Sequence, residues 1–151
     1  MASNSTPPNN GTIIDKAHHF ALRVYFEDTD ITGVVHHPNY LKYCERARSE
    51  AMLLLGLDYA GVMAAGGGYF AIADVAIKYL RPAKLADDLT IISQITELRA
   101  ASWVVHQRVM RGAEELARAT IRVAFLSPDG RPTRQPRAWT EAYKLILKEQ
   151  A

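Results

Sequence analysis

The densest group of reactive side chains lies between Tyr25 and Tyr40, in the segment YFEDTDITGVVHHPNY. It contains three acids, two histidines and, at Pro38, a residue that favours the first turn of a helix. The start of a helix exposes unpaired N–H groups and the equivalent of about half a positive charge. These groups stabilise an oxygen that gains negative charge, and a carboxylate upstream on the same loop can reach the same reacting carbon. An acid and an oxyanion donor are the minimum needed to transfer an acyl group to water.

A long amphipathic helix is predicted to follow this segment, from Asn39 to a stop near Gly56. Apolar residues recur at the three-to-four spacing of one helical stripe between Tyr40 and Leu54. Charged residues fall on the opposite side. The helix start is therefore placed directly after the reactive segment.

Five segments have the composition and alternation of β-strands, and short connections between the last four favour antiparallel hairpins. A short terminal helix is predicted over 139–147. Because one helix cannot cover both faces of such a sheet, we expect an α+β fold in which a five-stranded antiparallel sheet curls around the central helix. The expected strands are 20–26, 69–80, 89–98, 103–110 and 116–126.

Length and composition describe one domain. The chain has 151 residues, of which 48% are hydrophobic, and we expect a disordered tail over residues 1–18 and a single domain over 19–151. A formal net charge of +2 offers no electrostatic argument for nucleic acid or a membrane surface as partner. The single cysteine, Cys44, excludes an internal disulfide and a multi-cysteine metal site. No apolar run is long enough to span a membrane and no secretion signal is present, so a cytoplasmic protein is expected.

The reactive segment and the order of elements resemble the hotdog-fold acyl-CoA thioesterases. The closer match is the branch of 4-hydroxybenzoyl-CoA thioesterase and the Tol-Pal-associated (YbgC-type) acyl-CoA thioesterases, over roughly residues 20 to 140. The residues that carry it are Asp28-Thr29-Asp30, Gly33-Val34-Val35, His37, Asn39-Tyr40 and Glu45-Arg46-Ala47-Arg48. Weaker downstream matches are Tyr79-Leu80-Arg81-Pro82-Ala83, Asp87-Asp88 and Gly130-Arg131-Pro132.

This resemblance implies a catalytic carboxylate at Asp30, acting as nucleophile or as general base for water. It places the oxyanion donor at the backbone N–H of His37, whose ring is also treated as part of the site in the Tol-Pal-associated members. Several of those members carry a tyrosine four residues before the aspartate, and that position is Phe26 here. The neighbouring Tyr25 would point the other way in a strand.

The remaining candidates are substrate contacts and structural residues. Substrate contacts are expected at Gly33, Val35, Asn39 and Tyr40, and at Lys78 and Arg81 for the phosphates of coenzyme A. Structural interpretations compete at four positions: Asp28 as a loop brace, Asn39 as a helix brace, Cys44 as core, and Glu45 as the partner of an ordinary ion pair with Arg46. Asp28 and Asp30 could suggest a metal site with His36 and His37 as further ligands, but adjacent histidines rarely both reach one ion and a D-x-D pair is a weak signal, so no metal is expected. No cofactor is expected either, because coenzyme A is part of the substrate.

The function expected from the resemblance is hydrolysis of a small acyl- or aromatic-CoA thioester to the free acid and coenzyme A. The site would lie between two subunits of a homodimer or homotetramer. Two alternatives stay open on the sequence: a hotdog dehydratase or hydratase, for which His37 would move protons, and a non-catalytic module that binds acyl-CoA.

Overall fold

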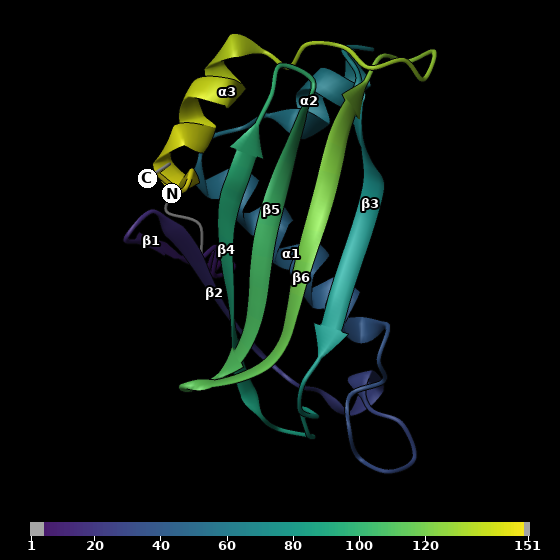
Figure 1. The fold of residues 1–151 in the computed structure, drawn as a ribbon, viewed down its shortest axis with the longest axis vertical. Coiled ribbons are helices and arrows are strands. Elements are labelled where there is room, and N and C mark those ends of the chain that lie inside the picture. The colour runs from purple at the N-terminus through teal and green to yellow at the C-terminus, as the bar shows by residue number, and fades with distance from the viewer. Residues whose placement is uncertain (1–4, 150–151) are drawn as a thin grey trace.

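A six-stranded antiparallel sheet curls around the long helix α1 in the computed structural model, which describes residues 5–149 (Figure 1). The strand order is β1-β2-β4-β5-β6-β3, and all neighbours are antiparallel. The strands are β1 Thr12–Ile14, β2 Ala17–Arg23, β3 Tyr69–Tyr79, β4 Asp88–Leu98, β5 Ser102–Arg111 and β6 Glu114–Leu126. The predicted α+β architecture is confirmed, with one additional short strand.

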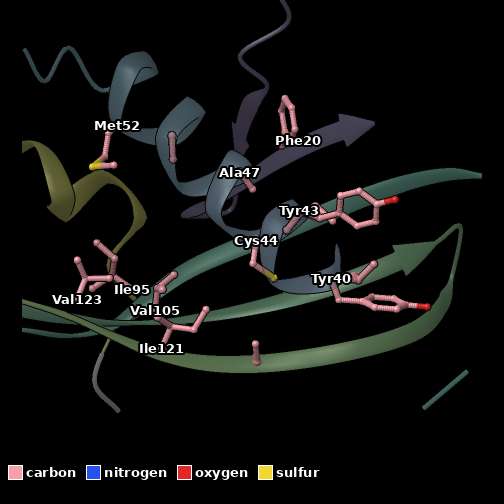
Figure 2. Packing of buried hydrophobic residues seen from close by; sticks show 14 of the residues in the cluster. Phe20, Tyr40, Tyr43, Cys44, Ala47, Met52, Ile95, Val105, Ile121 and Val123 are labelled. Atoms are coloured by element: carbon pink, nitrogen blue, oxygen red, sulfur yellow. The ribbon is translucent and has the colours of Figure 1, made fainter. Parts of the chain in front are cut away.

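Helix α1, Asn39–Leu54, buries the stripe that the sequence predicted. Cys44 and Ala47 are fully buried, and Figure 2 shows them directed toward β-strand residues that include Val105 and Ile121. Alternate residues of β4, β5 and β6 are buried on the same side, because successive side chains of a strand point to opposite faces. The core therefore lies between α1 and the concave face of the sheet.

The remaining helices are short. Helix α2, Tyr59–Ala64, follows α1, and two single-turn 3-10 helices, η1 and η2, span Phe26–Asp28 and Lys144–Ile146. The predicted C-terminal helix is observed as α3, Arg137–Tyr143, continued by η2. Trp139 of α3 is buried and stacks on Phe70 with ring centroids 5.6 Å apart, so this segment covers one end of the core.

The N-terminal segment differs from the expected tail over residues 1–18. Residues 12–14 form β1, which pairs with β2 through a turn at Asp15 and Lys16, whose φ values are 50° and 58°. Two consecutive left-handed residues suit the twist of a tight hairpin, and β-branched Thr12, Ile13 and Ile14 favour a strand. Residues 1–4 of the expected tail and residues 150–151 of the expected domain lie outside the described part of the chain.

Two further expectations were wrong in detail. Strand β2 ends at Arg23, so Tyr25 and Phe26 lie in the loop before α1 and not in a strand. β4, β5 and β6 are consecutive hairpin partners as predicted, but β3 pairs with β6 and not with β4. The segment between β3 and β4 is therefore a crossover connection. Which strands pair depends on contacts between segments that are distant in the sequence, and the composition of a strand does not predict it.

Strand β3 forms one edge of the sheet, and among residues 5–149 its only strand partner is β6. Three residues of β3 lie opposite buried residues of β6, so their side chains face the same side of the sheet as α1. The pairs are Ile72 with Val123, Val75 with Ile121, and Tyr79 with Ala117. These three side chains are nevertheless 48%, 40% and 43% exposed. An apolar strip of β3 is thus left incompletely covered.

No helix in the described part of the chain is both long and apolar enough to cross a membrane.

Candidate active site

The segment between β2 and α1 folds back on itself as a small hairpin-like loop. The Asp30 N–H donates to the Val34 carbonyl at 2.9 Å, and the His36 N–H donates to the Asp28 carbonyl at 2.9 Å. Gly33 closes the tip with a φ of 80°, in the left-handed region that glycine adopts without steric cost. One arm of the loop therefore carries Asp30 and the other leads through His36 into the helix start.

The carboxylate of Asp30 is exposed and already oriented. Its Oδ1 accepts hydrogen bonds from the Thr32 N–H at 2.8 Å and from the Thr32 hydroxyl at 2.6 Å. These two bonds, and to a smaller extent the charge of His36, hold the pKa of Asp30 below its ordinary value because they favour the ionised form. Asp30 is consequently an anion near neutral pH, as a nucleophile or general base must be.

The amide of His37 is a free donor at the start of α1. The next N–H groups are used within the first turn: that of Asn39 donates to the His36 carbonyl at 2.9 Å and that of Tyr40 to the His37 carbonyl at 3.3 Å. Pro38 has no N–H. Within residues 5–149 the His37 N–H has no hydrogen-bond acceptor. It is therefore available to an oxygen of a ligand, and the His37 side chain is itself exposed.

Tyr79, which sequence reasoning missed as a site residue, meets His37 from the end of β3. Its hydroxyl donates to the His37 carbonyl at 3.1 Å, and the two rings are perpendicular with centroids 6.1 Å apart. The same ring lies edge-on to Tyr40 at 5.3 Å. The only sequence signal was its place in the weak downstream motif, since the contact joins residues 42 positions apart.

Three of the expected substrate contacts hold the loop and the helix in place. Val35 and Tyr40 are 5% and 3% exposed, and the Tyr40 hydroxyl accepts the Ala83 N–H at 2.9 Å. The Asn39 side-chain amide donates to the Asp28 carbonyl at 2.8 Å, which is the bracing role considered for it. Gly33 is partly exposed at the loop tip, next to Asp30.

The expected phosphate-binding cations differ in their surroundings. Lys78 is exposed and forms no ion pair with any described residue. Arg81 pairs with Glu114 at 2.6 Å, and Glu114 also pairs with Arg111 at 2.6 Å. The charge of Arg81 is thus already compensated.

The structural interpretations divide as well. The Asp28 carboxylate accepts the Tyr25 N–H at 2.8 Å, so its role as a loop brace is confirmed. Cys44 is buried as predicted, and burial raises the pKa of its thiol to about 11. The ion pair expected between Glu45 and Arg46 is not formed, and neither side chain has any other ion-pair partner within residues 5–149.

The strand argument about Tyr25 and Phe26, made because Phe26 stands where several family members have a tyrosine, does not hold in the structure. Tyr25 and Phe26 are 60% and 82% exposed. Tyr25 precedes the 3-10 turn η1 and Phe26 is its first residue, so the two do not lie on opposite faces of a strand. The phenol of Tyr25 is therefore not excluded from the loop by strand geometry.

Comparison with known proteins adds to this geometry. A family model described as the thioesterase superfamily (4HBT) matches residues 32–117. An acyl-CoA thioesterase YbgC from Haemophilus influenzae is 37% identical over 112 residues, which cover 74% of this chain and 82% of that protein. An acyl-CoA thioester hydrolase YbgC from Escherichia coli is 35% identical over 108 residues, covering 71% and 80%.

Solved structures give the same result. A probable thioesterase from Bartonella henselae has a TM-score of 0.75 at 35% identity, over 80% of this chain and 99% of that one. A 1,4-dihydroxy-2-naphthoyl-CoA thioesterase from Synechocystis has a TM-score of 0.80 at 23% identity, over 85% and 96%, which supports the fold alone. The chain therefore has the hotdog fold and belongs to the thioesterase superfamily.

Proposed function

We propose that this protein hydrolyses acyl-CoA thioesters to the free acid and coenzyme A. The names of the relatives from Haemophilus influenzae and Escherichia coli, which refer to acyl-CoA thioester hydrolysis, support this reaction class. The observation that carries the proposal is the pairing, on the two arms of one loop, of an ionised carboxylate at Asp30 with an unused N–H at His37.

In the proposed reaction the thioester carbonyl oxygen accepts the N–H of His37 and lies at the positive end of α1. Asp30 either attacks the carbonyl carbon or removes a proton from the attacking water. If Asp30 attacks, the carbon–sulfur bond breaks to give a mixed anhydride, which water then hydrolyses to the free acid and the regenerated carboxylate. If Asp30 acts as a base, water adds to the carbonyl carbon directly and the carbon–sulfur bond then breaks. In both routes the leaving thiolate takes up a proton that comes from the water, so coenzyme A leaves as the thiol. A preorganised donor at the oxyanion is typically worth about 3 kcal/mol of transition-state stabilisation. Coenzyme A enters as part of the substrate, so this scheme includes no separate cofactor.

The proposal includes a second subunit. The exposed Ile72, Val75 and Tyr79 lie along an unpaired strand edge, and long unpaired edges are normally paired or covered. If two copies join these edges around a two-fold axis, the Tyr69 end of one β3 meets the Tyr79 end of the other. The partner would then border the loop that holds Asp30 and His37, in a homodimer or in a tetramer of two such dimers.

A panel of acyl-CoAs assayed with a thiol reagent tests the reaction. Cys44 is buried with a pKa of about 11, so it should add no background while the protein is folded. We expect thiol release from at least one thioester and a loss of about 100-fold or more in Asp30→Asn, the scale of general base catalysis. Asp28→Asn is the matched control: it changes the same charge on the same loop and should retain much more activity.

Two results would contradict the proposal. Near-normal turnover by folded Asp30→Asn would remove Asp30 from the mechanism. Hydration of an enoyl-CoA without thiol release, or binding of acyl-CoA without any reaction, would favour one of the two alternative functions.

A further inference from the structure

A second feature of interest is a cavity of about 300 Å³ at the far end of α1 from the catalytic loop. It lies among α1, α2 and the concave side of the sheet, and its lining is mostly apolar. Three polar residues of α1 also border it: Glu45, Arg48 and Ser49. The main apolar contributors are Met52, Met63, Phe70, Ile72, Trp103 and Val123.

Arg48 is held rigidly at this cavity by a buried network. Arg48 is only 7% exposed, and its Nη1 donates to Gln107 Oε1 at 3.0 Å. Gln107 is fully buried, and its amide nitrogen donates to the Cys44 carbonyl at 2.9 Å and to the Ser93 hydroxyl at 2.9 Å. Because both amide hydrogens are used, the oxygen of Gln107 must face Arg48. The guanidinium is therefore positioned by the core and not by solvent.

Among residues 5–149, no carboxylate lies at contact distance from the Arg48 guanidinium. A guanidinium carries five N–H donors, and only one hydrogen bond to a described residue is formed. The acid on the same lining, Glu45, precedes it by three residues but is exposed and forms no ion pair with it. A buried cation without a bound acid is costly, and planar guanidinium groups bind carboxylates through two parallel hydrogen bonds. The guanidinium of Arg48 is therefore fixed at one place on the cavity lining, where it can bind a carboxylate.

The apolar strip of β3 lies between the catalytic loop and this cavity. Tyr79 contacts His37, and Val75 and Ile72 follow it along the same face of β3, both partly exposed. Ile72 itself lines the cavity. An acyl chain whose carbonyl lies at the helix start can thus run along β3 and end beside Arg48.

We propose that this cavity receives acyl groups that end in a carboxylate, so that the enzyme prefers coenzyme A monothioesters of dicarboxylic acids. This inference rests on the proposed function and names its substrate class. The Arg48 guanidinium would bind the distal carboxylate, while the apolar walls would hold the methylene chain. A site that hydrogen-bonds one end of a substrate rejects the analogue without that group far more strongly than an apolar pocket rejects one methylene.

The length of helix α1 between the catalytic loop and Arg48 predicts the preferred length of the acyl chain. The helix rises by about 14 Å between Asn39 and Arg48, and an extended chain covers about 3.5 Å for every three bonds. About twelve bonds, and so about thirteen carbons counting both carboxyl carbons, span this rise, and the preference should be strongest for acyl groups near that length.

The experiment compares saturated acyl-CoAs with ω-carboxyacyl-CoAs of equal length, from six to fourteen carbons, by thiol release. For the wild-type protein we expect kcat/KM to favour the carboxylate series by about tenfold or more at the optimum length and less at shorter lengths. Arg48→Met should abolish this preference, mainly by raising KM for the carboxylate series. Arg48→Lys keeps the charge without the planar fork and should retain part of the preference. Arg46→Met, an exposed arginine on the same helix, is the matched control and should keep all of it.

The outcomes separate the two proposals. Equal or better turnover of saturated chains at every length by the wild-type protein would overturn the dicarboxylate inference and leave the thioesterase function intact. A carboxylate preference that survives in folded Arg48→Met would also overturn it. If Arg48→Met does not fold, the wild-type length series and Arg48→Lys decide the question. No thiol release from either series would overturn the function and, with it, the inference.

Discussion

The hydroxyl of Tyr79 donates a hydrogen bond of 3.1 Å to the carbonyl oxygen of His37, and so ties the end of an edge strand to the start of the central helix. The two residues belong to elements that are separated in the chain by the whole of α1 and α2. The His37 peptide also presents, at the helix start, an N–H that has no acceptor among residues 5–149. Tyr79 is therefore placed to position the proposed oxyanion donor without touching the reacting atoms.

Tyr79→Phe should lower kcat by about 3- to 10-fold, because one hydrogen bond contributes about 0.5–1.5 kcal/mol and the ring contacts with His37 and Tyr40 are kept. KM should change little if the role is positioning. Tyr143→Phe, which removes a hydroxyl at the opposite end of the sheet, should leave both constants unchanged. Equal effects on kcat and on the melting temperature in the two variants would indicate a general structural role.

Replacing His37 by alanine should cost much less activity than Asp30→Asn. The side chain of His37 is exposed, and the proposed donor is the backbone N–H, which alanine retains. We expect a loss of no more than about tenfold in kcat/KM, compared with about 100-fold or more for Asp30→Asn. A loss as large as that of Asp30→Asn would instead assign the imidazole a direct part in proton transfer.

The pH dependence should follow the lowered pKa of Asp30. A carboxylate with a depressed pKa stays ionised as the pH falls and is protonated only below its ordinary value of 3.8. The acidic limb of kcat/KM should therefore lie below that value, with no loss attributable to Asp30 between pH 7 and 5. Thr32→Val removes the hydroxyl that stabilises the anion, so it should move the limb to higher pH. A wild-type limb near pH 6 would point to another ionising group.

The buried network around Gln107 should contribute strongly to stability. Gln107→Met leaves the Arg48 guanidinium, the Ser93 hydroxyl and the Cys44 carbonyl without their partner in the core. We expect the free energy of unfolding in urea to fall by about 3 kcal/mol. Gln94→Met, at a half-buried position of β4 whose amide donates only to the Lys16 carbonyl, should cost less than about 1 kcal/mol. A loss of that small size for Gln107→Met would show that Arg48 finds another acceptor.

Val75→Lys tests the proposed subunit contact at β3. Val75 is 40% exposed in the single chain, so the lysine can reach solvent and the fold should persist. In an assembly joined at this edge it would place two charges in an apolar contact, and light scattering should show a smaller particle with reduced activity. A wild-type protein that is monomeric at the assay concentration and fully active would contradict the shared site.

Local sequence determined more of the site than of the sheet. The apolar stripe from Tyr40 onward predicts α1 because helical periodicity is a local property. The loop motif likewise predicts Asp30 and His37 as site residues before any fold is known. The alternation in β6 predicts its buried face in the same way. The bracing role of Asp28 also follows from residues a few positions away.

Contacts between distant segments were decided only by the tertiary structure. The pairing of β3 with β6, the covering of Ile95 and Trp103 by the C-terminal segment, and the contact of Tyr79 with His37 join segments whose separation in the chain carries no periodic signal. In the sequence Arg48 is one charged residue of a motif, and only the fold shows that its guanidinium is buried and donates a hydrogen bond to Gln107, 59 positions later. Strand order depends on which edges meet when the whole sheet closes over the helix, and that is a property of the entire chain and not of any local pattern.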